Sequence, residues 1–392
     1  MQTPSFDALV IGGGINGLSS LYHLTRRGLN RVGLVERFRL SHGRGSSHGH
    51  SRITRSAYVD ARYVRLMQRL QKVDWPELEA VAGQRLIHPT PGCFFGSPGG
   101  KWESYARAVT EIGADCEVID LAEARRRFRM FRFVSAVGAV DDRTAAVVAA
   151  ARTIQALLRL SLSRGAEVLE ETKVAAIDAT RSPIHVDLED GRQLITERLI
   201  VTAGAWAGDL LPPVRPQLQV ARQTVGYFRL AGDPRQFEVG QFPVWGNLGG
   251  TPGQEFYGLP SFGQPGIKVA RHIVAGADDD PDEVPEEVPE QELTRLEQYV
   301  TEEFTAPVEG MISYEHCLYT NTATEDFVID LHPDSDAIAI GAGFSGHGFK
   351  FGPLIGRVLV ELVCDGASSI EEFNIMRKTF SGCTDRNTHR PS

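Results

Sequence analysis

The chain begins with a short apolar run that is followed at once by glycines. Residues 8–11 are apolar at four consecutive positions, as in a strand buried on both faces. From residue 15 the apolar positions recur at helical spacing until Gly28. Residues 32–35 form a second apolar run, which ends at Glu36. This order predicts a strand, a helix and a second strand, as at the start of a dinucleotide-binding sheet.

Apolar runs of the same kind recur in the middle and near the end of the chain. Residues 198–206 predict a buried strand that ends in a glycine turn, after a hairpin signal at residues 189–192. Residues 168–177 are a further strand candidate. Residues 337–340 predict a last buried strand, and an apolar helix follows from Pro353 through Val363.

The stretches between these elements carry longer β-like segments. We therefore expect two interleaved domains, each built from separated parts of the chain. The predicted boundaries are 1–84, 141–215 and 322–380 for the dinucleotide-binding domain, 85–140 and 216–321 for the second domain, and 381–392 for a tail.

The glycines after the first strand have the spacing of a dinucleotide-binding turn. Gly12 allows the tight turn, Gly14 lets a pyrophosphate approach the backbone, and Gly17 lets helix and strand pack closely. Glu36 can accept a hydrogen bond from a ribose hydroxyl and would repel the 2′-phosphate of NADP, which leaves NAD and FAD open. The candidate residues of this site are Gly12, Gly14, Ile15, Asn16, Gly17, Glu36 and Arg37.

Composition and charge exclude several classes of protein. Of the 392 residues, 42% are hydrophobic and 23% are charged, which is typical of a globular chain and excludes a disordered or fibrous one. The net charge of −9 disfavours binding to nucleic acid or to an anionic membrane. No apolar run reaches the roughly 18 residues of a membrane span, and no secretory signal is recognisable. A cytoplasmic location is expected.

The spacing of the cysteines and of the acidic residues points to no functional site. The five cysteines are scattered and form no CxxC pair, which predicts reduced thiols and neither a disulfide framework nor a metal site. Residues 278–292 hold nine acidic residues and three prolines, and we expect a solvated surface loop there.

Lysine is rare in this chain. Only six of the 41 basic residues are lysines, and the others are arginines. A coding bias that replaces surface lysine by arginine explains this most simply. Under such a bias, a lysine that remains is a better candidate for a specific role. Lys268 and Lys350 lie among apolar or aromatic residues, whereas Lys72, Lys101, Lys173 and Lys378 look like surface residues.

Four segments carry candidate site residues. Residues 44–55 combine glycines and serines with three arginines, and a flexible basic loop is the alternative. Residues 341–352 place Lys350 among aromatic residues and glycines, where an ammonium is costly unless it meets an anion. Lys268 follows a Tyr-Gly-Leu-Pro segment in a strand pattern and could equally face water. In residues 315–320, Cys317 taken alone reads as a buried apolar residue.

Together these segments resemble the FAD-dependent amine oxidase family of monomeric sarcosine oxidase, N-methyltryptophan oxidase and the peroxisomal sarcosine/pipecolate oxidases. The resemblance lies in Gly-Ser-Ser-His-Gly-x-Ser-Arg-Ile-x-Arg from Gly45, Cys-x-Tyr-Thr-Asn-Thr from Cys317 and Gly-Ala-Gly-Phe-Ser-Gly-His-Gly-Phe-Lys from Gly341. It extends in order from Phe6 to about residue 380 and favours FAD over NAD. It implies an α/β fold class, with a Rossmann-type FAD-binding domain interleaved with an α+β substrate domain on a mainly antiparallel sheet.

The resemblance also implies roles for matched residues. Cys317 would form a covalent thioether to the flavin, and Lys268 would activate dioxygen beside Arg52. Arg55 and Lys350 would bind the substrate carboxylate. Tyr257, His272, Tyr319 and His347 would line the substrate cavity. Further residues expected at the cofactor are Ser46, His48, Ser51, Arg52, Val174, Gly204, Trp206, Gly343, Phe344, Gly346, His347, Gly348 and Lys350.

The implied reaction is oxidation of the C–N bond of a secondary α-amino acid to an imine, with reduction of O2 to H2O2. The reactive amine should be deprotonated, so rates should rise with pH. The family also implies a monomer. Ser47 and His50 depart from the histidine and aspartate of bacterial sarcosine oxidases, and the Ser-Ser-His and Thr-Asn-Thr tracts are more similar to the peroxisomal enzymes. Residues outside the motifs diverge, so sarcosine, pipecolate, proline and bulky N-methyl amino acids all stay open. The alternatives are a flavin dehydrogenase with another electron acceptor and a non-catalytic FAD-binding protein.

Overall fold

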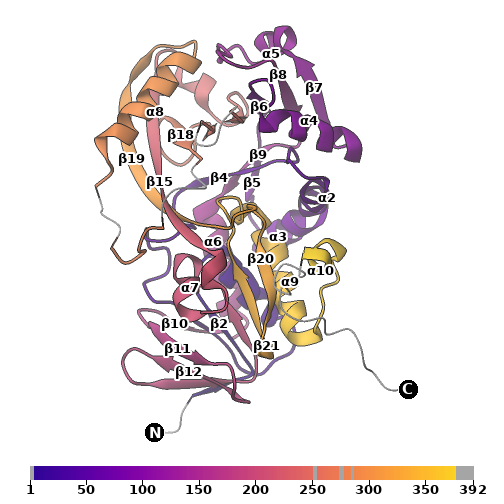
Figure 1. Ribbon diagram of the computed structural model, residues 1–392, viewed down its shortest axis with the longest axis vertical. Coiled ribbons are helices and arrows are strands. Elements are labelled where there is room, and N and C mark those ends of the chain that lie inside the picture. The colour runs from indigo at the N-terminus through magenta and orange to yellow at the C-terminus, as the bar shows by residue number, and fades with distance from the viewer. Residues whose placement is uncertain (1–3, 250–253, 273–277, 284–286, 377–392) are drawn as a thin grey trace.

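The computed structural model describes residues 4–249, 254–272, 278–283 and 287–376. Two large sheets organise the chain, one in each half of the elongated molecule (Figure 1). A six-stranded sheet with helices α1 and α9 forms the lower half, and an eight-stranded sheet with α4, α5 and α8 forms the upper half. No helix in the described ranges is long and apolar enough to cross a membrane.

The six-stranded sheet has the order β10-β3-β2-β14-β21-β20, and all neighbours are parallel except β20 with β21. Its central strands are buried along their length, because residues such as Leu9, Val10 and Ile200 are apolar on both faces. The four buried strands that the apolar runs predict here are confirmed. The strands are β2 (Ala8–Ile11), β3 (Val32–Val35), β10 (Glu167–Leu169), β14 (Leu199–Val201), β20 (Val328–His332) and β21 (Ser335–Ala342).

One predicted strand is wrong. The apolar pattern of residues 168–177 suggests one continuous strand, but the chain turns at Glu171, whose φ is +52°. The first part is β10, and the second part is β11 in a separate four-stranded sheet of order β1-β13-β12-β11. The hairpin between β12 and β13 is confirmed. These strands are β1 (Ser5–Phe6), β11 (Val174–Asp178), β12 (Ile184–Leu188) and β13 (Gln193–Thr196).

Helices α1 and α9 pack against each other and against the six-stranded sheet. Their close approach requires glycine, because a Cβ on Gly356 would lie 2.3 Å from Ser19 Oγ. The predicted apolar helix from Pro353 is confirmed as α9. The helices of this half are α1 (Ile15–Leu24), α2 (Ala61–Arg69), α3 (Trp75–Ala82), α6 (Ala150–Leu162), α7 (Ala207–Leu210), α9 (Gly352–Asp365) and α10 (Glu371–Met376), with a π-helical turn (Leu70–Asp74) that joins α2 to α3.

The eight-stranded sheet has the order β19-β15-β18-β17-β16-β6-β8-β7, and every pairing is antiparallel except β16 with β6. Aromatic residues, among them Phe131, Phe242 and Trp245, form its core. The strands are β6 (Gly92–Gly96), β7 (Cys116–Asp120), β8 (Gly138–Asp142), β15 (Gln219–Leu230), β16 (Val244–Asn247), β17 (Phe256–Leu259), β18 (Ile267–Arg271) and β19 (Val308–Asn321), and the helices are α4 (Lys101–Ile112), α5 (Leu121–Arg127) and α8 (Glu290–Glu303).

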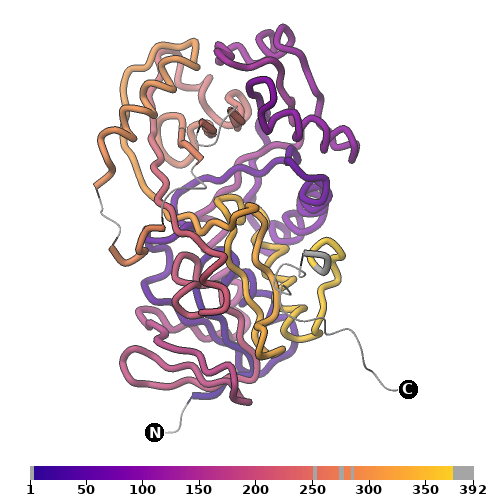
Figure 2. The backbone as a smooth tube through the Cα atoms, in the orientation of Figure 1, coloured from indigo at the N-terminus to yellow at the C-terminus, as the bar shows by residue number. Residues whose placement is uncertain are grey.

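A small sheet of β4 (Ser51–Thr54), β9 (Ala146–Ala149) and β5 (Ile87–Pro89) lies near the middle of the molecule (Figure 1). The chain passes repeatedly between the two halves, so indigo and yellow segments from opposite ends of the sequence lie together in the lower half (Figure 2). The predicted fold class is confirmed. The domain boundaries stay a prediction, and the predicted tail, 381–392, lies outside the described residues.

Candidate active site

One large cavity of about 810 Å³ is lined by residues from both halves of the molecule. One end lies at the carboxyl ends of β2 and β3, beside the N-terminus of α1. The other end lies against β17, β18 and β19 of the eight-stranded sheet. The volume falls within the range of about 300–1,000 Å³ that is typical of small-molecule and cofactor sites.

The glycine turn after β2 brings the backbone close to the cavity wall. Gly12 has a φ of +101°, which side chains rarely tolerate. A Cβ on Gly17 would lie 1.8 Å from the carbonyl oxygen of Gly12, so only glycine lets α1 start so close to the strand. The backbone N–H of Ile15 donates to Ser47 Oγ at 3.1 Å, which joins the turn to the polar segment of residues 44–55.

Glu36 at the end of β3 stabilises the same turn. Its carboxylate accepts hydrogen bonds from the backbone N–H groups of Gly13 at 2.6 Å and Phe38 at 2.9 Å. Burial raises the pKa of Glu36, but hydrogen bonds from His42, Gly13 and Phe38 outweigh burial, and the pKa lies below its usual value. The carboxylate is therefore ionised, and its remaining lone pairs can accept from a ribose.

Arg37 and Trp206 lie together at the same end of the cavity. Arg37 Nη2 donates to Asp282 Oδ2 at 2.9 Å, and Trp206 Nε1 donates to Asp282 Oδ1 at 2.7 Å. Asp282 belongs to the acidic segment for which the sequence predicts a solvated loop. Asp278 and Asp282 are exposed, in agreement with that prediction, and Asp278 also pairs with Arg215. These exposed ion pairs tie the described part of the segment to the fold.

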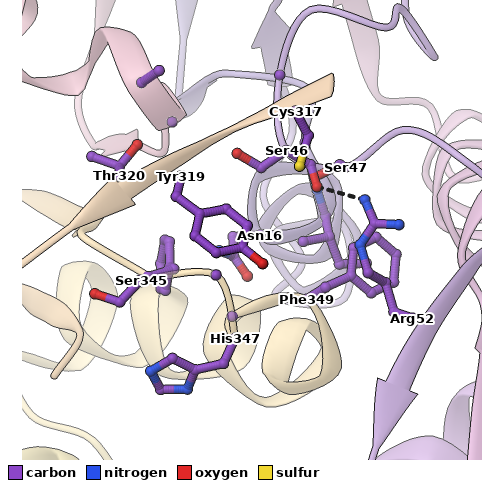
Figure 3. Close-up of a pocket in the computed structure, with 18 of the residues that line it drawn as sticks. Asn16, Ser46, Ser47, Arg52, Cys317, Tyr319, Thr320, Ser345, His347 and Phe349 are labelled. Atoms are coloured by element: carbon purple, nitrogen blue, oxygen red, sulfur yellow. Dashed lines mark hydrogen bonds between the residues drawn. The ribbon is translucent and has the colours of Figure 1, made fainter. Parts of the chain in front are cut away.

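At the other end of the cavity, alternate residues of three strands face inward. Tyr257 of β17, Lys268 of β18, and Cys317 and Tyr319 of β19 all line the cavity. The hydroxyls of Tyr257 and Tyr319 are 3.0 Å apart and hydrogen-bonded. Figure 3 shows Cys317 and Tyr319 on the side of β19 that faces Ser46 and Arg52.

Two cations lie near Cys317. Arg52 donates to the carbonyl oxygens of Ser46 at 2.8 Å and His48 at 2.7 Å, which fixes its guanidinium group. The Nζ atom of Lys268 is 3.5 Å from the carbonyl oxygen of Ser51. Burial and the positive charge of Arg52 lower the pKa of Lys268 to about 7. Burial raises the pKa of the Cys317 thiol, although Arg52 and Lys268 act in the opposite direction.

A second pair of cations meets at one aromatic ring. Arg55 lies 4.5 Å above the ring of Tyr58, and its Nη2 donates to the Tyr105 hydroxyl at 3.1 Å. Lys350 Nζ donates to the Tyr58 hydroxyl at 3.0 Å and to the carbonyl oxygen of His347 at 3.1 Å. Burial, then Arg55 and Arg52, lower the pKa of Lys350 well below its ordinary value. A buried cation pair of this kind favours an anionic ligand.

The glycine-rich segment after β21 completes this wall. Gly346 has a φ of +74°, and a Cβ there would lie 2.1 Å from the ring of Tyr319. His347 Nε2 bonds the carbonyl oxygen of Glu325 at 2.9 Å. Burial and the charge of Lys350 lower the pKa of His347 to about 3, so its ring is neutral at physiological pH.

A charged group that sequence reasoning missed lies on the same wall. Lys101 Nζ pairs with Glu325 at 2.8 Å and with Glu255 at 3.0 Å, and His272 Nε2 lies 3.6 Å from Glu325. Burial raises the pKa of Glu325, but His272 and Lys101 outweigh burial and hold it at about 2. Lys101 is partly exposed, as expected of a surface lysine, but it also lines the cavity and pairs with carboxylates from distant parts of the chain.

Buried polar atoms at the cavity fit a bound cofactor. Asn16 Oδ1, His48 Nε2 and Thr320 Oγ1 are buried and have no hydrogen-bond partner among the described residues. All three side chains line the cavity. Buried polar atoms are normally satisfied, so these three, together with the glycine turn, fit a dinucleotide with polar atoms along its length.

The structure gathers nearly all predicted site residues at one cavity. Gly17 is the exception, since it lies beneath the turn and serves packing. The predicted residues that line the cavity are Gly12, Gly14, Ile15, Asn16, Glu36, Arg37, Ser46, His48, Ser51, Arg52, Arg55, Val174, Gly204, Trp206, Tyr257, Lys268, His272, Cys317, Tyr319, Gly343, Phe344, Gly346, His347, Gly348 and Lys350. Their individual roles stay predictions.

Tyr58 and Tyr105, like Lys101, were missed. Tyr58 lies three residues after Arg55, the last residue of the polar segment 44–55, so this closeness in sequence was the one available signal. Tyr105 lies on α4, and nothing in its local sequence connects it with Arg55.

Known proteins resemble this chain over most of its length. The family model described as FAD dependent oxidoreductase matches residues 7–362. A peroxisomal sarcosine oxidase from Mus musculus is 35% identical over 372 residues, which covers 92% of this chain and 93% of the relative. A monomeric sarcosine oxidase from Bacillus sp. (strain B-0618) is 32% identical over 394 residues, which covers 98% of this chain and 99% of the relative.

Solved structures share the fold at lower identity. NikD, described as an unusual amino acid oxidase essential for nikkomycin biosynthesis, aligns with a TM-score of 0.80 at 21% identity and covers 94% of this chain and 97% of its own. An L-proline dehydrogenase from P. horikoshii aligns with a TM-score of 0.77 at 19% identity, and the alignment covers 96% of this chain and 99% of the dehydrogenase. At these identities the likeness concerns the fold alone.

Proposed function

The chain belongs to the family of FAD-dependent oxidoreductases, and we propose from this membership and the site geometry that it oxidises secondary α-amino acids to imines while reducing O2 to H2O2. The observation that carries the proposal is the cation pair of Arg55 and Lys350 around Tyr58, in the same cavity as Lys268. A carboxylate bound between the first two cations would offset part of their charge and would hold the substrate in the cavity that Lys268 also lines.

FAD would supply the redox chemistry of this family: it would take up the hydride equivalent that leaves the carbon bonded to the amine nitrogen, and it would pass two electrons to dioxygen. Gly12 and Gly14 would face its pyrophosphate at the α1 N-terminus, and Glu36 would bind its ribose. Asn16, His48 and Thr320 supply polar atoms that this cofactor would satisfy.

Each side chain at the ring end then has a proposed role. Arg55 and Lys350 hold the substrate carboxylate. Neutral His347 and the hydrogen-bonded pair of Tyr257 and Tyr319 enclose the reacting amine and exclude water. The amine reacts without its proton, because a lone pair on nitrogen is needed to form the imine. His272 completes this part of the lining.

Lys268 and Cys317 have proposed roles at the cofactor. The Lys268 ammonium stabilises negative charge that develops when dioxygen is reduced. Cys317 would hold the cofactor through a thioether bond. Acid precipitation tests this attachment: covalent flavin stays with the precipitated protein, and Cys317→Ala releases it. A Cys317→Ala precipitate that stays yellow would place the bond elsewhere.

The chemistry is tested by measuring peroxide and substrate consumption with sarcosine, pipecolate, proline and bulkier N-methyl amino acids. We expect one peroxide for each substrate consumed. Substrate-dependent bleaching of the flavin without peroxide would identify a dehydrogenase with another acceptor. No bleaching by any member of the panel would identify a non-catalytic FAD-binding protein.

The oligomeric state and location are part of the same proposal. We infer a monomer, because a relative such as the Bacillus enzyme is described as monomeric and residues of a single chain line the cavity. We also propose that it acts in the cytoplasm. Light scattering of the purified holoenzyme measures the mass directly, and a dimer mass would contradict the proposal.

A further inference from the structure

One carboxylate on the cavity side of the eight-stranded sheet has no role in the proposed function. Strand register places Lys268 opposite Tyr227 and Glu315 opposite Val225. Val225 and Tyr227 are two residues apart on β15, so their side chains share a face. Glu315 therefore lies on the same face as Lys268, and both line the cavity.

Tyr227 connects the two charged residues. Its hydroxyl donates to Glu315 Oε2 at 3.2 Å, and its ring centroid is 5.9 Å from Lys268 Nζ. Glu315 also lies close to Arg52: a Cβ placed on Gly49 would be 3.6 Å from Arg52 Nη1 and 3.6 Å from Glu315 Oε2. The carboxylate thus faces both cations at this end of the cavity.

The charge around Lys268 is unbalanced without this carboxylate. Burial and then Arg52 lower the pKa of the lysine, whereas Cys317 and Glu315 raise it. Burial and the two cations hold the pKa of His48 at about 3, so that ring is neutral. The other groups on this side are hydroxyls and a thiol. The titratable or charged groups around Lys268 are His48, Arg52, Tyr227, Tyr257, Glu315 and Cys317.

Cys317 does not supply the missing negative charge. Burial raises the pKa of its thiol, and a thioether sulfur carries no charge either, so this side chain is neutral with or without a bond to the cofactor. Glu315 is therefore the anion, among the described residues that act on Lys268, that offsets Arg52.

We propose that Glu315, held by Tyr227, is a positioning residue that keeps Lys268 protonated and so sets the pH range in which the reduced protein reacts with dioxygen. The inference rests on the proposed function for the role of Lys268, but the coupling between the two residues does not depend on the substrate. Replacing Glu315 removes a stabilising charge, so Lys268 should lose its proton at a lower pH, by about one pH unit.

The experiment compares holoenzyme variants over pH 5.5–9.5. Dithionite-reduced flavin is mixed with oxygenated buffer, and the reoxidation rate is followed by absorbance. In Glu315→Gln the pH at which the rate falls to half should drop by about one unit. Glu309→Gln is the matched control, because it changes the same charge at an exposed position on the same strand. An unchanged midpoint in Glu315→Gln would overturn the proposal.

A second readout is independent of turnover. Carbamylation of Lys268 by cyanate, which needs the free amine, is followed by peptide mass spectrometry against pH. Its midpoint should shift in the same direction in Glu315→Gln, and a shift equal to that of Glu309→Gln contradicts the coupling. If Glu315→Gln fails to fold, Tyr227→Phe removes only the hydroxyl and should give a smaller shift of the same sign.

These measurements separate the two proposals. Dithionite replaces the amino acid, so a protein that no amino acid reduces still reports the coupling. A normal reductive half-reaction with an unshifted midpoint refutes the role of Glu315 and leaves the proposed function standing.

Discussion

The Tyr58 hydroxyl accepts a hydrogen bond from Lys350 Nζ at 3.0 Å, while the ring of the same tyrosine lies 4.5 Å from the Arg55 guanidinium. One side chain therefore orients both cations that are proposed to bind the substrate carboxylate. Tyr58→Phe keeps the ring and removes the acceptor. We expect kcat/KM for the amino acid to fall by about tenfold, since a hydrogen bond to a charged group is lost.

Tyr63→Phe is the control for this prediction. Tyr63 belongs to the same aromatic cluster, but its hydroxyl donates to Asp326 at 3.0 Å and contacts neither cation. The two variants are compared by steady-state kinetics and by titrating a small carboxylate inhibitor against the flavin spectrum. Equal losses in both variants would mean that the cluster matters only for packing.

Gly346 is predicted to tolerate no side chain. Its φ is +74°, and a Cβ would lie 2.1 Å from the Tyr319 ring, which is itself fixed by Tyr257. Gly346→Ala should therefore cost about 2–4 kcal/mol of stability from backbone strain and overpacking, and it should weaken flavin retention. Thermal unfolding and flavin fluorescence measure the two effects.

Gly366→Ala separates strain from overpacking. Gly366 ends α9 with a φ of +77°, and nothing lies within 4 Å of the Cβ position. We expect a loss of only about 1 kcal/mol, with normal flavin binding. If both variants lose the same stability, contact with Tyr319 contributes nothing.

Sequence reasoning succeeds here where the determinants are local. Gly12, Gly14 and Glu36 lie within one strand–helix–strand unit, so their spacing already predicts their common position. Lys350 and Lys268 could be singled out because an ammonium in an apolar pattern needs a reason. These predictions hold in the folded protein because the residues on which they rest are neighbours in the sequence.

The remaining features depend on contacts between distant segments. Lys101 is half-exposed on α4, and only the fold brings Glu255 and Glu325 to it. The break between β10 and β11 follows from a left-handed residue, Glu171, in a pattern that otherwise suits one strand. Asp282 accepts a hydrogen bond from Trp206 Nε1, a contact that local composition cannot indicate.

The buried carboxyl group of Glu303 makes the stability of the fold depend on pH. Glu303 on α8 is 3% exposed and accepts from the Phe133 N–H at 2.7 Å. Burial raises its pKa from 4.5 to about 7, although backbone hydrogen bonds and Arg132 oppose the shift. The folded chain therefore holds this proton longer than the unfolded chain. The contribution to stability is fully present below pH 4.5 and is lost as the pH rises to about 7.

Glu303→Gln should remove this dependence. At pH 8 the variant should gain about 2–3 kcal/mol over the parent, with no gain at pH 4.5. Urea unfolding at the two pH values measures the difference. Glu302→Gln, which changes an exposed carboxylate next in sequence, should leave the dependence as it is. A parental pH dependence in Glu303→Gln would contradict the buried-proton explanation.

The last prediction concerns Lys268, which is 5% exposed and whose pKa lies near 7. Lys268→Arg keeps a positive charge but replaces a compact ammonium by a larger, delocalised group. We expect reoxidation of reduced flavin by dioxygen to slow by about tenfold, with reduction by the amino acid changed less than about threefold. In the parent protein reoxidation should fall as the pH rises through 7, because the ammonium loses its proton. In the arginine variant that fall should disappear, since a guanidinium stays charged. Stopped-flow measurement of each half-reaction between pH 6 and 9 tests both points. Equal losses of rate in the two half-reactions would contradict the proposed role of Lys268 in the reaction with dioxygen.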